Sequence, residues 1–155
     1  MNAKPQLIEL AQRFADLHLD TVMIGNAAAA IQGAPVTTLD IDFMLKWTDD
    51  NYKKLAVLAQ QMKCLFIEMK LPGDNYMYRL ENKADSIYID FLFIAAGIES
   101  FEALKQRGMD VFFGGHPLRI ASLEDIVKSK RMAGRPKDVA ILDILEMTLD
   151  EKRNQ

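Results

Sequence analysis

The sequence predicts an α+β domain with a mixed β-sheet, flanking helices and a two-helix segment at its C-terminal end. Stretches with helical spacing of apolar residues are interspersed with short apolar runs that are typical of strands. The chain has 155 residues and 50% of them are hydrophobic, which suits one folded core. It contains no evident repeat, linker or low-complexity tract, so a single domain is expected.

The first elements surround a glycine turn. Apolar residues at helical spacing predict an amphipathic helix over 4–18, and a β-like run over 21–24 ends at Gly25. Asn26 is expected to cap a following helix, 27–31, which contains four alanines. The first amides of that helix would be free to face an anion.

The middle of the chain reads as a sheet interrupted by one long helix. A strand is expected over 39–45, and Thr48 then caps a helix over 50–62. Three further strands are expected at 64–69, 76–80 and 86–94, followed by a short helix near 100–107 and a strand near 109–113.

Two helices are expected to finish the chain after the Gly114-Gly115 turn. Ser122 and Asp125 have the spacing of a capping box and begin the first helix. Gly134 ends that helix, and Pro136 suits the first turn of the last one.

The composition excludes several classes of protein. A net charge of −3 does not favour a protein that coats nucleic acids through bulk charge. The single cysteine, Cys64, excludes an internal disulfide and fits a reducing compartment. The first residues, MNAKPQLIELAQRF, lack the order of a signal peptide, and no apolar run approaches the roughly 18–20 residues of a membrane span. We therefore expect a cytoplasmic protein without a membrane partner.

Asp40 and Asp42 are the first candidate functional residues. Alternate residues of a strand point to the same face, with Cα atoms about 6–7 Å apart. Two carboxylates held in this way suit a hard divalent cation such as Mg²⁺ and the phosphates that it bridges. The alternative is an amphipathic edge strand that buries Leu39 and Ile41 and leaves the aspartates in water.

Asp90 is the third candidate. It lies in SIYIDFLF, a run that is apolar on both faces and therefore typical of a central strand. A carboxylate there is costly unless a cation or hydrogen-bond donors compensate it. If this strand lies beside 39–45, three carboxylates converge on one patch. The alternatives for Asp90 are a buried salt bridge and an ordinary position at a strand end.

Lys130 and Asp138 are polar residues that the helical spacing directs inward. Lys130 lies on the apolar stripe of the first C-terminal helix, and Asp138 lies on that of the last. Buried lysines are normally paired. The two residues could form a salt bridge between the helices. The basic run 128–137 suits either a solvated helix end or an RNA contact, and His18 and His116 read as structural.

These residues resemble the nucleotidyltransferase superfamily, which includes DNA polymerase beta and the small bacterial minimal nucleotidyltransferases. The matching residues are Gly25 in the strand–helix turn, Asp40 and Asp42 in the Asp-x-Asp pair, and Asp90 on a later strand. The segment SLEDIVKSKRMAGRPKD is similar to the closing segment of a bacterial branch of unknown target. The resemblance implies one nucleotidyltransferase-like domain over 1–155.

The resemblance also implies roles for individual residues. The expected catalytic and metal-binding residues are Asp40, Asp42 and Asp90, with Asp90 either completing a second metal site or acting as a base. The expected nucleotide-binding residues are Gly25, Asn26, Thr38, Lys130 and Asp138. Lys130 would contact the triphosphate or the leaving pyrophosphate, and Asp138 would orient Lys130. Two positions depart from the family pattern: Asn26 replaces a glycine or serine, and Val36 occupies the place of an arginine.

The function implied is Mg²⁺-dependent, or Mn²⁺-dependent, transfer of a nucleoside monophosphate from a nucleoside triphosphate to an acceptor hydroxyl. The acceptor, which could be a protein, an RNA or a small molecule, is not evident from the residues. The alternative is a catalytically degenerate protein of the same fold that binds a nucleotide or a partner protein and regulates it, for example in a toxin–antitoxin pair. Either a homodimer or a partner protein could complete the site.

Overall fold

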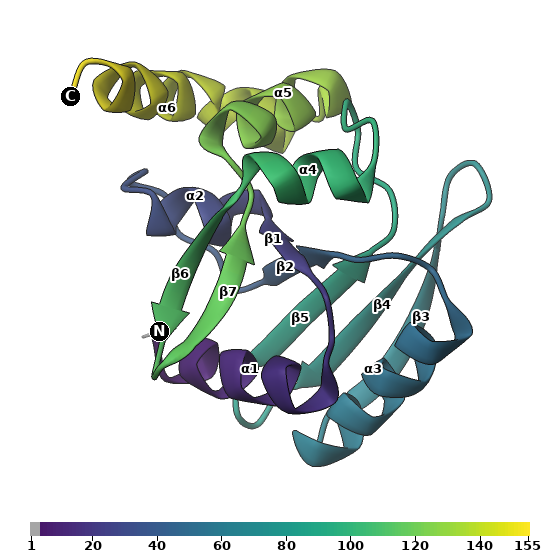
Figure 1. The fold of residues 1–155 in the computed structure, drawn as a ribbon. Coiled ribbons are helices and arrows are strands. Elements are labelled where there is room, and N and C mark those ends of the chain that lie inside the picture. Colours follow the sequence, from purple (N-terminus) through teal and green to yellow (C-terminus); the bar gives the residue numbers. More distant parts are fainter. Residues whose placement is uncertain (1–3) are drawn as a thin grey trace.

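The computed structural model describes residues 4–155, so residues 1–3 of the predicted domain lie outside the described part. The described chain forms one mixed β-sheet with helices on its sides (Figure 1). In spatial order the strands are β3 (Leu65–Leu71), β4 (Asn75–Asn82), β5 (Ile87–Leu92), β2 (Ile41–Met44), β1 (Val22–Ile24), β7 (His116–Ile120) and β6 (Met109–Phe113). The helices are α1 (Lys4–Leu17), α2 (Gly25–Ile31), α3 (Asp49–Gln61), α4 (Phe101–Arg107), α5 (Leu123–Ala133) and α6 (Pro136–Arg153). The predicted α+β class is confirmed.

The strand pairing puts the candidate residues in the middle of the sheet. Strand β2 runs antiparallel to β1 and parallel to β5, while β4 is antiparallel to both β3 and β5. The predicted adjacency of the strands that carry Asp42 and Asp90 is therefore confirmed.

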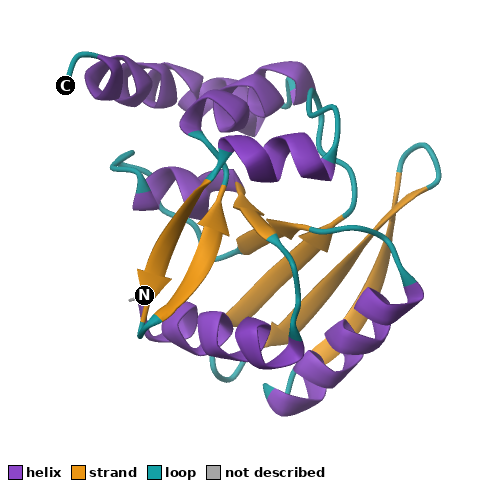
Figure 2. Ribbon diagram, viewed as in Figure 1, coloured by secondary structure: helices purple, strands orange, loops and turns teal. Residues whose placement is uncertain are grey.

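One face of these central strands is apolar and packs on α1. Phe14 of α1 meets Phe43 of β2 edge to face, with ring centroids 5.0 Å apart, and Phe43 stacks on Phe91 of β5 at 5.7 Å. Figures 1 and 2 show α1 and α3 along one side of the sheet and α4, α5 and α6 grouped at the other side. Because side chains alternate along a strand, the residues next to Phe43 and Phe91, namely Asp42 and Asp90, face away from this core.

Polar caps fix the helix ends as the sequence predicts. Thr48 accepts a hydrogen bond from the Asn51 amide at 3.0 Å, and Ser122 accepts one from the Asp125 amide at 3.1 Å. Gly134 ends α5 in the left-handed conformation, with φ 62°, and Pro136 begins α6. No helix within residues 4–155 is long and apolar enough to cross a membrane.

The strand expected over 39–45 is shorter in the structure, because β2 begins at Ile41. Asp40 lies just before it, where the Thr38 hydroxyl accepts a hydrogen bond from the Asp40 amide at 3.1 Å. Leu39 is 62% exposed rather than buried. The prediction that Asp40 belongs to the strand is therefore wrong, since the Thr38 hydroxyl takes the amide that a strand ladder would use.

Two further expectations are wrong. Helix α2 begins at Gly25, so Asn26 lies within its first turn, and the N-cap residue is Ile24, whose side chain makes no capping hydrogen bond among the described residues. Strand β7, which pairs with β6 and with β1, was not expected between the Gly114-Gly115 turn and α5. His116 and Pro117 obscured its short apolar pattern, because proline is depleted in strands and β7 alternates over only five residues.

Candidate active site

A row of residues crosses four strands on the face opposite the aromatic core. Ile24 of β1 pairs with Asp42 of β2, Asp42 pairs with Asp90 of β5, and Asp90 pairs with Arg79 of β4. The row thus brings two carboxylates and a guanidinium together, with the Gly25 turn at one end.

The row forms part of a cleft of about 760 Å³. Of the predicted residues, Gly25, Asp40, Asp42, Asp90 and Lys130 line it. Thr38, Asn26 and Asp138 are not among the described residues that line it. The wall near the β3–β4 hairpin is largely apolar and includes Leu71, Pro72, Met77, Leu92 and Ile94.

Gly25 is required by its conformation and by its closeness to Asp42. Its φ is +73°, and a Cβ built on it would lie 2.6 Å from Asp42 Oδ2. Any side chain here would displace the Asp42 carboxylate as well as strain the backbone. The glycine therefore leaves the space that the Asp42 carboxylate occupies.

We expect Gly25→Ala to destabilise the protein by about 1–3 kcal/mol, the cost of a strained left-handed residue, and to shift Asp42. Gly115→Ala is a matched control, because Gly115 has φ +88° and a Cβ there would meet no described residue within 4 Å. Thermal melting should show a larger loss for Gly25→Ala. Equal losses for the two variants would contradict a specific role of the Gly25–Asp42 contact.

The Asp42 carboxylate is strongly affected by its surroundings. Burial, followed by the negative charges of Asp90 and Asp40, raises the pKa of Asp42 to about 7, while Lys130 opposes the rise. Such a group is poorly compensated as an anion. A divalent cation would stabilise its charged form.

Arg79 is the residue that sequence reasoning missed. Its Nε and Nη2 donate to Asp90 Oδ1 and Oδ2 at 2.7 and 2.9 Å, and its Nη2 lies 3.7 Å from Asp40 Oδ2. Asp90 is 5% exposed, so the buried salt bridge considered as an alternative for it is present. The hydrogen bond to Asp90 is the main cause that raises the pKa of Arg79. The sequence signal for the contact between Arg79 and Asp90 is the short connection between β4 and β5, which aligns the two residues.

Asn26 holds an unsatisfied polar atom beside the turn. Its Oδ1 is buried and has no hydrogen-bond partner among the described residues. Buried polar atoms of this kind are rare in folded proteins and call for an explanation. Since rotation of the amide exchanges its oxygen and nitrogen, Asn26 could accept a hydrogen bond from a ligand or donate one.

Lys130 reaches the cleft from α5, with Asp138 of α6 behind it. The Lys130 Nζ lies 3.6 Å from Asp138 Oδ1, and Arg135 Nε donates to Asp138 Oδ2 at 2.6 Å. The Asp138 side chain is 1% exposed. Burial lowers the pKa of Lys130, although Asp138 and Asp42 act in the opposite direction. The salt bridge that was one of the two alternatives for this pair is present, with Arg135 as an additional partner of Asp138.

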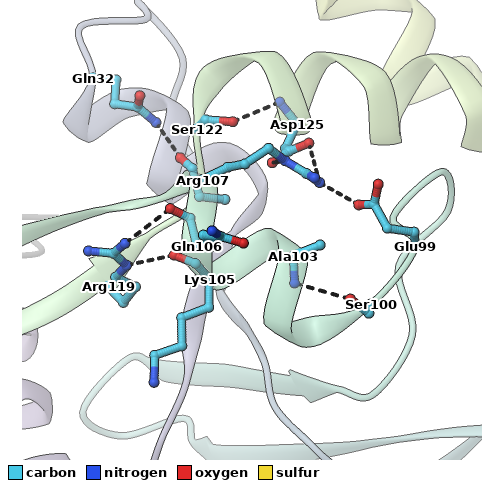
Figure 3. A network of polar contacts seen from close by, with 11 residues as sticks. Gln32, Glu99, Ser100, Ala103, Lys105, Gln106, Arg107, Arg119, Ser122 and Asp125 are labelled. Carbon is cyan, nitrogen blue, oxygen red and sulfur yellow. Dashed lines mark hydrogen bonds and ion pairs between the residues drawn. The ribbon is translucent and has the colours of Figure 1, made fainter.

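A second ion-pair network holds α5 in place (Figure 3). Arg107, at the end of α4, donates from Nε and Nη2 to Asp125 Oδ2 and Oδ1 at 2.8 and 3.0 Å. The same Nη2 donates to Glu99 at 2.5 Å. Because α5 carries Lys130, this network also helps to position Lys130 at the cleft.

The carboxylates of the cleft suit a divalent cation that is bound by two of them better than one that is surrounded by all three. Among residues 4–155, no group of three His, Cys, Asp or Glu side chains is arranged to hold a metal ion. Asp40 and Asp42 lie at the cleft, and Asp42 is the carboxylate that lacks compensation. Hard oxygen ligands of this kind suit Mg²⁺ or Mn²⁺.

Comparison with known proteins gives structural likeness but no sequence match. No protein-family model matches the chain, and no curated protein does. The antibiotic-resistance factor ANT(2″)-Ia, in complex with adenylyl-2″-tobramycin, is 14% identical with a TM-score of 0.65, over 99% of this chain and 92% of that one. The lincosamide antibiotic adenylyltransferase LnuA, bound to lincomycin, is 11% identical with a TM-score of 0.61, over 92% and 96%. A candidate nucleotidyltransferase of Thermotoga maritima is 21% identical with a TM-score of 0.60, over 97% and 96%. At these identities the likeness shows the fold alone.

Proposed function

We propose that this chain, which has the fold of the nucleotidyltransferase superfamily, moves a nucleoside monophosphate from a nucleoside triphosphate to an acceptor hydroxyl. The acceptor oxygen would form a bond to the α-phosphorus while the bond from that phosphorus to the β-phosphate oxygen breaks. Pyrophosphate leaves, and the hydroxyl proton passes to a carboxylate of the site.

The observation that carries this proposal is the convergence of Asp40, Asp42 and Asp90 beside the Gly25 turn in one cleft. Asp40 and Asp42 would hold Mg²⁺ or Mn²⁺. Such an ion, when bound, neutralises phosphate charge and orients the reacting groups. Asp90 is proposed as the proton acceptor, in the role of the base.

The remaining residues would bind and orient the nucleotide. The turn at Gly25 lines the cleft and would lie near the bound phosphates, and it is followed by Asn26, whose Oδ1 is buried without a partner among the described residues. Lys130 would neutralise charge on the leaving pyrophosphate. Thr38 and Asp138 would act indirectly, since Thr38 bonds to the backbone of Asp40 and Asp138 lies behind Lys130.

The test is transfer of label from nucleotides radiolabelled at the α-phosphate, with Mg²⁺ or Mn²⁺ and a panel of acceptors. The panel includes tobramycin, lincomycin, RNA and the protein itself. Tobramycin is bound in adenylylated form in the ANT(2″)-Ia structure, and lincomycin is bound in the LnuA structure. Labelled product together with released pyrophosphate supports the proposal. Asp110→Asn is a suitable control, because Asp110 pairs with Arg119 on β7 and does not line the cleft. No product with any acceptor, under conditions in which the nucleotide binds, would contradict it.

The second candidate is a protein of the same fold that binds a nucleotide or a partner protein without transfer. The observation that favours it is the bidentate pair between Arg79 and Asp90, which already uses both oxygens of that carboxylate. The presence of Val36 in the place of the family's arginine also favours this candidate. Nucleotide binding without pyrophosphate release would support this candidate over the enzyme.

A further inference from the structure

Arg79 contacts both carboxylate oxygens of Asp90, the third candidate metal ligand. The two residues are partners in the register of β4 and β5, so the strand ladder itself holds them opposite each other. Both guanidinium nitrogens are within 2.9 Å of the carboxylate, one on each oxygen. Charge-assisted bidentate pairs of this kind are strong and geometrically specific.

The carboxylate of this pair is shielded from water, and the guanidinium is partly so. The Asp90 side chain is 7% exposed and that of Arg79 is 25% exposed. Losing the partner of a buried charge is costly, so a metal ion at Asp90 would compete with a well-placed guanidinium. By contrast, Asp40 has a side chain that is 43% exposed, and its contact with Arg79 is a looser one of 3.7 Å.

The guanidinium of Arg79 already compensates part of the carboxylate charge of the site. It pairs with both oxygens of Asp90 and lies 3.7 Å from Asp40 Oδ2. A cation bound at Asp90 would lie beside this guanidinium, and like charges at such short range repel each other.

We propose that the guanidinium of Arg79 takes the place of a second divalent cation at Asp90, so that the site binds one divalent cation, through Asp40 and Asp42. This inference rests on the proposed function and deepens it. Asp90 is then a base that Arg79 orients, and the expectation of a second metal site at Asp90 is dropped. Arg79 is a positioning residue, because it acts through Asp90.

The test counts Mn²⁺ ions by electron paramagnetic resonance on the whole chain, with a nucleotide analogue that cannot be cleaved at the α-phosphate. Two Mn²⁺ ions about 3.5–4 Å apart couple magnetically, whereas a single ion gives an uncoupled spectrum. We expect one bound Mn²⁺ per chain in the wild-type protein, without coupling. In Arg79→Gln, which frees both oxygens of Asp90, we expect a second ion and a coupled spectrum.

Three variants complete the test. Arg107→Gln is the matched control, because Arg107 makes the same bidentate contact with the buried Asp125 at 2.8 and 3.0 Å, and it should keep one uncoupled ion. Arg79→Lys keeps the charge and should also bind one ion. Arg79→Gln/Asp90→Asn removes both charges, and it should remain folded with one ion even if Arg79→Gln does not fold.

The outcomes separate this inference from the proposed function. A coupled pair of ions in the wild-type protein, or in Arg79→Lys, overturns the inference and leaves the proposed function intact. A second ion in Arg107→Gln overturns it as well, since the gain would not be specific to Asp90. If no Mn²⁺ binds to the wild-type protein with the analogue, both the inference and the proposed function are overturned.

Discussion

Asp42→Asn is expected to lower nucleotidyl transfer by at least about 100-fold, the loss that follows removal of one group that stabilises charge in a transition state. The asparagine side chain would keep the shape of the aspartate and lose its negative charge. The variant should nevertheless fold well. Its metal-free melting temperature should rise, because the substitution removes a desolvated charge that Asp90 and Asp40 repel. The two measurements are product formation with Mg²⁺ and thermal melting without metal.

The combination of effects separates a functional from a structural role of Asp42. If the role of Asp42 were purely structural, the variant would be less stable than the wild-type protein, and its activity would fall in proportion. Asp125→Asn provides the contrast, since Asp125 also lines the cleft but is held by two hydrogen bonds from Arg107. We expect that variant to lose stability. A lower melting temperature for Asp42→Asn would contradict our account of its electrostatics.

Asp138→Ala is expected to destabilise the protein by about 3 kcal/mol, because it leaves Lys130 buried without its carboxylate. In a domain of this size a loss of 1 kcal/mol lowers the melting temperature by about 2–4 °C, so a decrease of about 6–12 °C should follow. The exposed Arg135 can be solvated when it loses Asp138, and it contributes less to the cost. Thermal melting of the metal-free protein measures the effect.

The double variant Lys130→Met/Asp138→Leu is the control. It removes both buried charges and fills the same space with apolar side chains, so it should recover most of the lost stability. It should not recover nucleotide binding, since Lys130 is the cation that α5 brings to the cleft. If the double variant is no more stable than Asp138→Ala, the ion pair is not the source of the loss.

The sequence predicted the elements whose signals are local. The hydroxyl caps at Thr48 and Ser122, the glycine at the end of α5 and the proline at the start of α6 each act within one helical turn. The run around Asp90 also identified a central strand, because a sequence that is apolar on both faces is typical of one. In the structure β2 is a neighbour of that strand, and their pairing places Asp42 opposite Asp90.

The sequence could not predict contacts that depend on register. Arg79 meets Asp90 only because the β4–β5 hairpin aligns them, and a shift of one residue would place Arg79 on the other face. The pair of Arg107 and Asp125 joins residues 18 positions apart whose contact depends on how α4 packs against α5. Asparagine is common at caps, which is why the sequence predicts Asn26 as the cap of a helix over 27–31, but the helix begins at Gly25, two residues before that predicted start.

The most direct test of the account is thermal melting of the wild-type protein and of Asp40→Asn/Asp42→Asn with Mg²⁺ and each of the four nucleoside triphosphates. At a nucleotide concentration of about 100 Kd, linkage predicts a stabilisation of about 2.7 kcal/mol. We expect this shift in the wild-type protein only when metal and nucleotide are both present, and we expect no shift in the variant. An equal shift in the variant would place the nucleotide elsewhere. No shift with any nucleotide in the wild-type protein would contradict a metal–nucleotide site at Asp40 and Asp42.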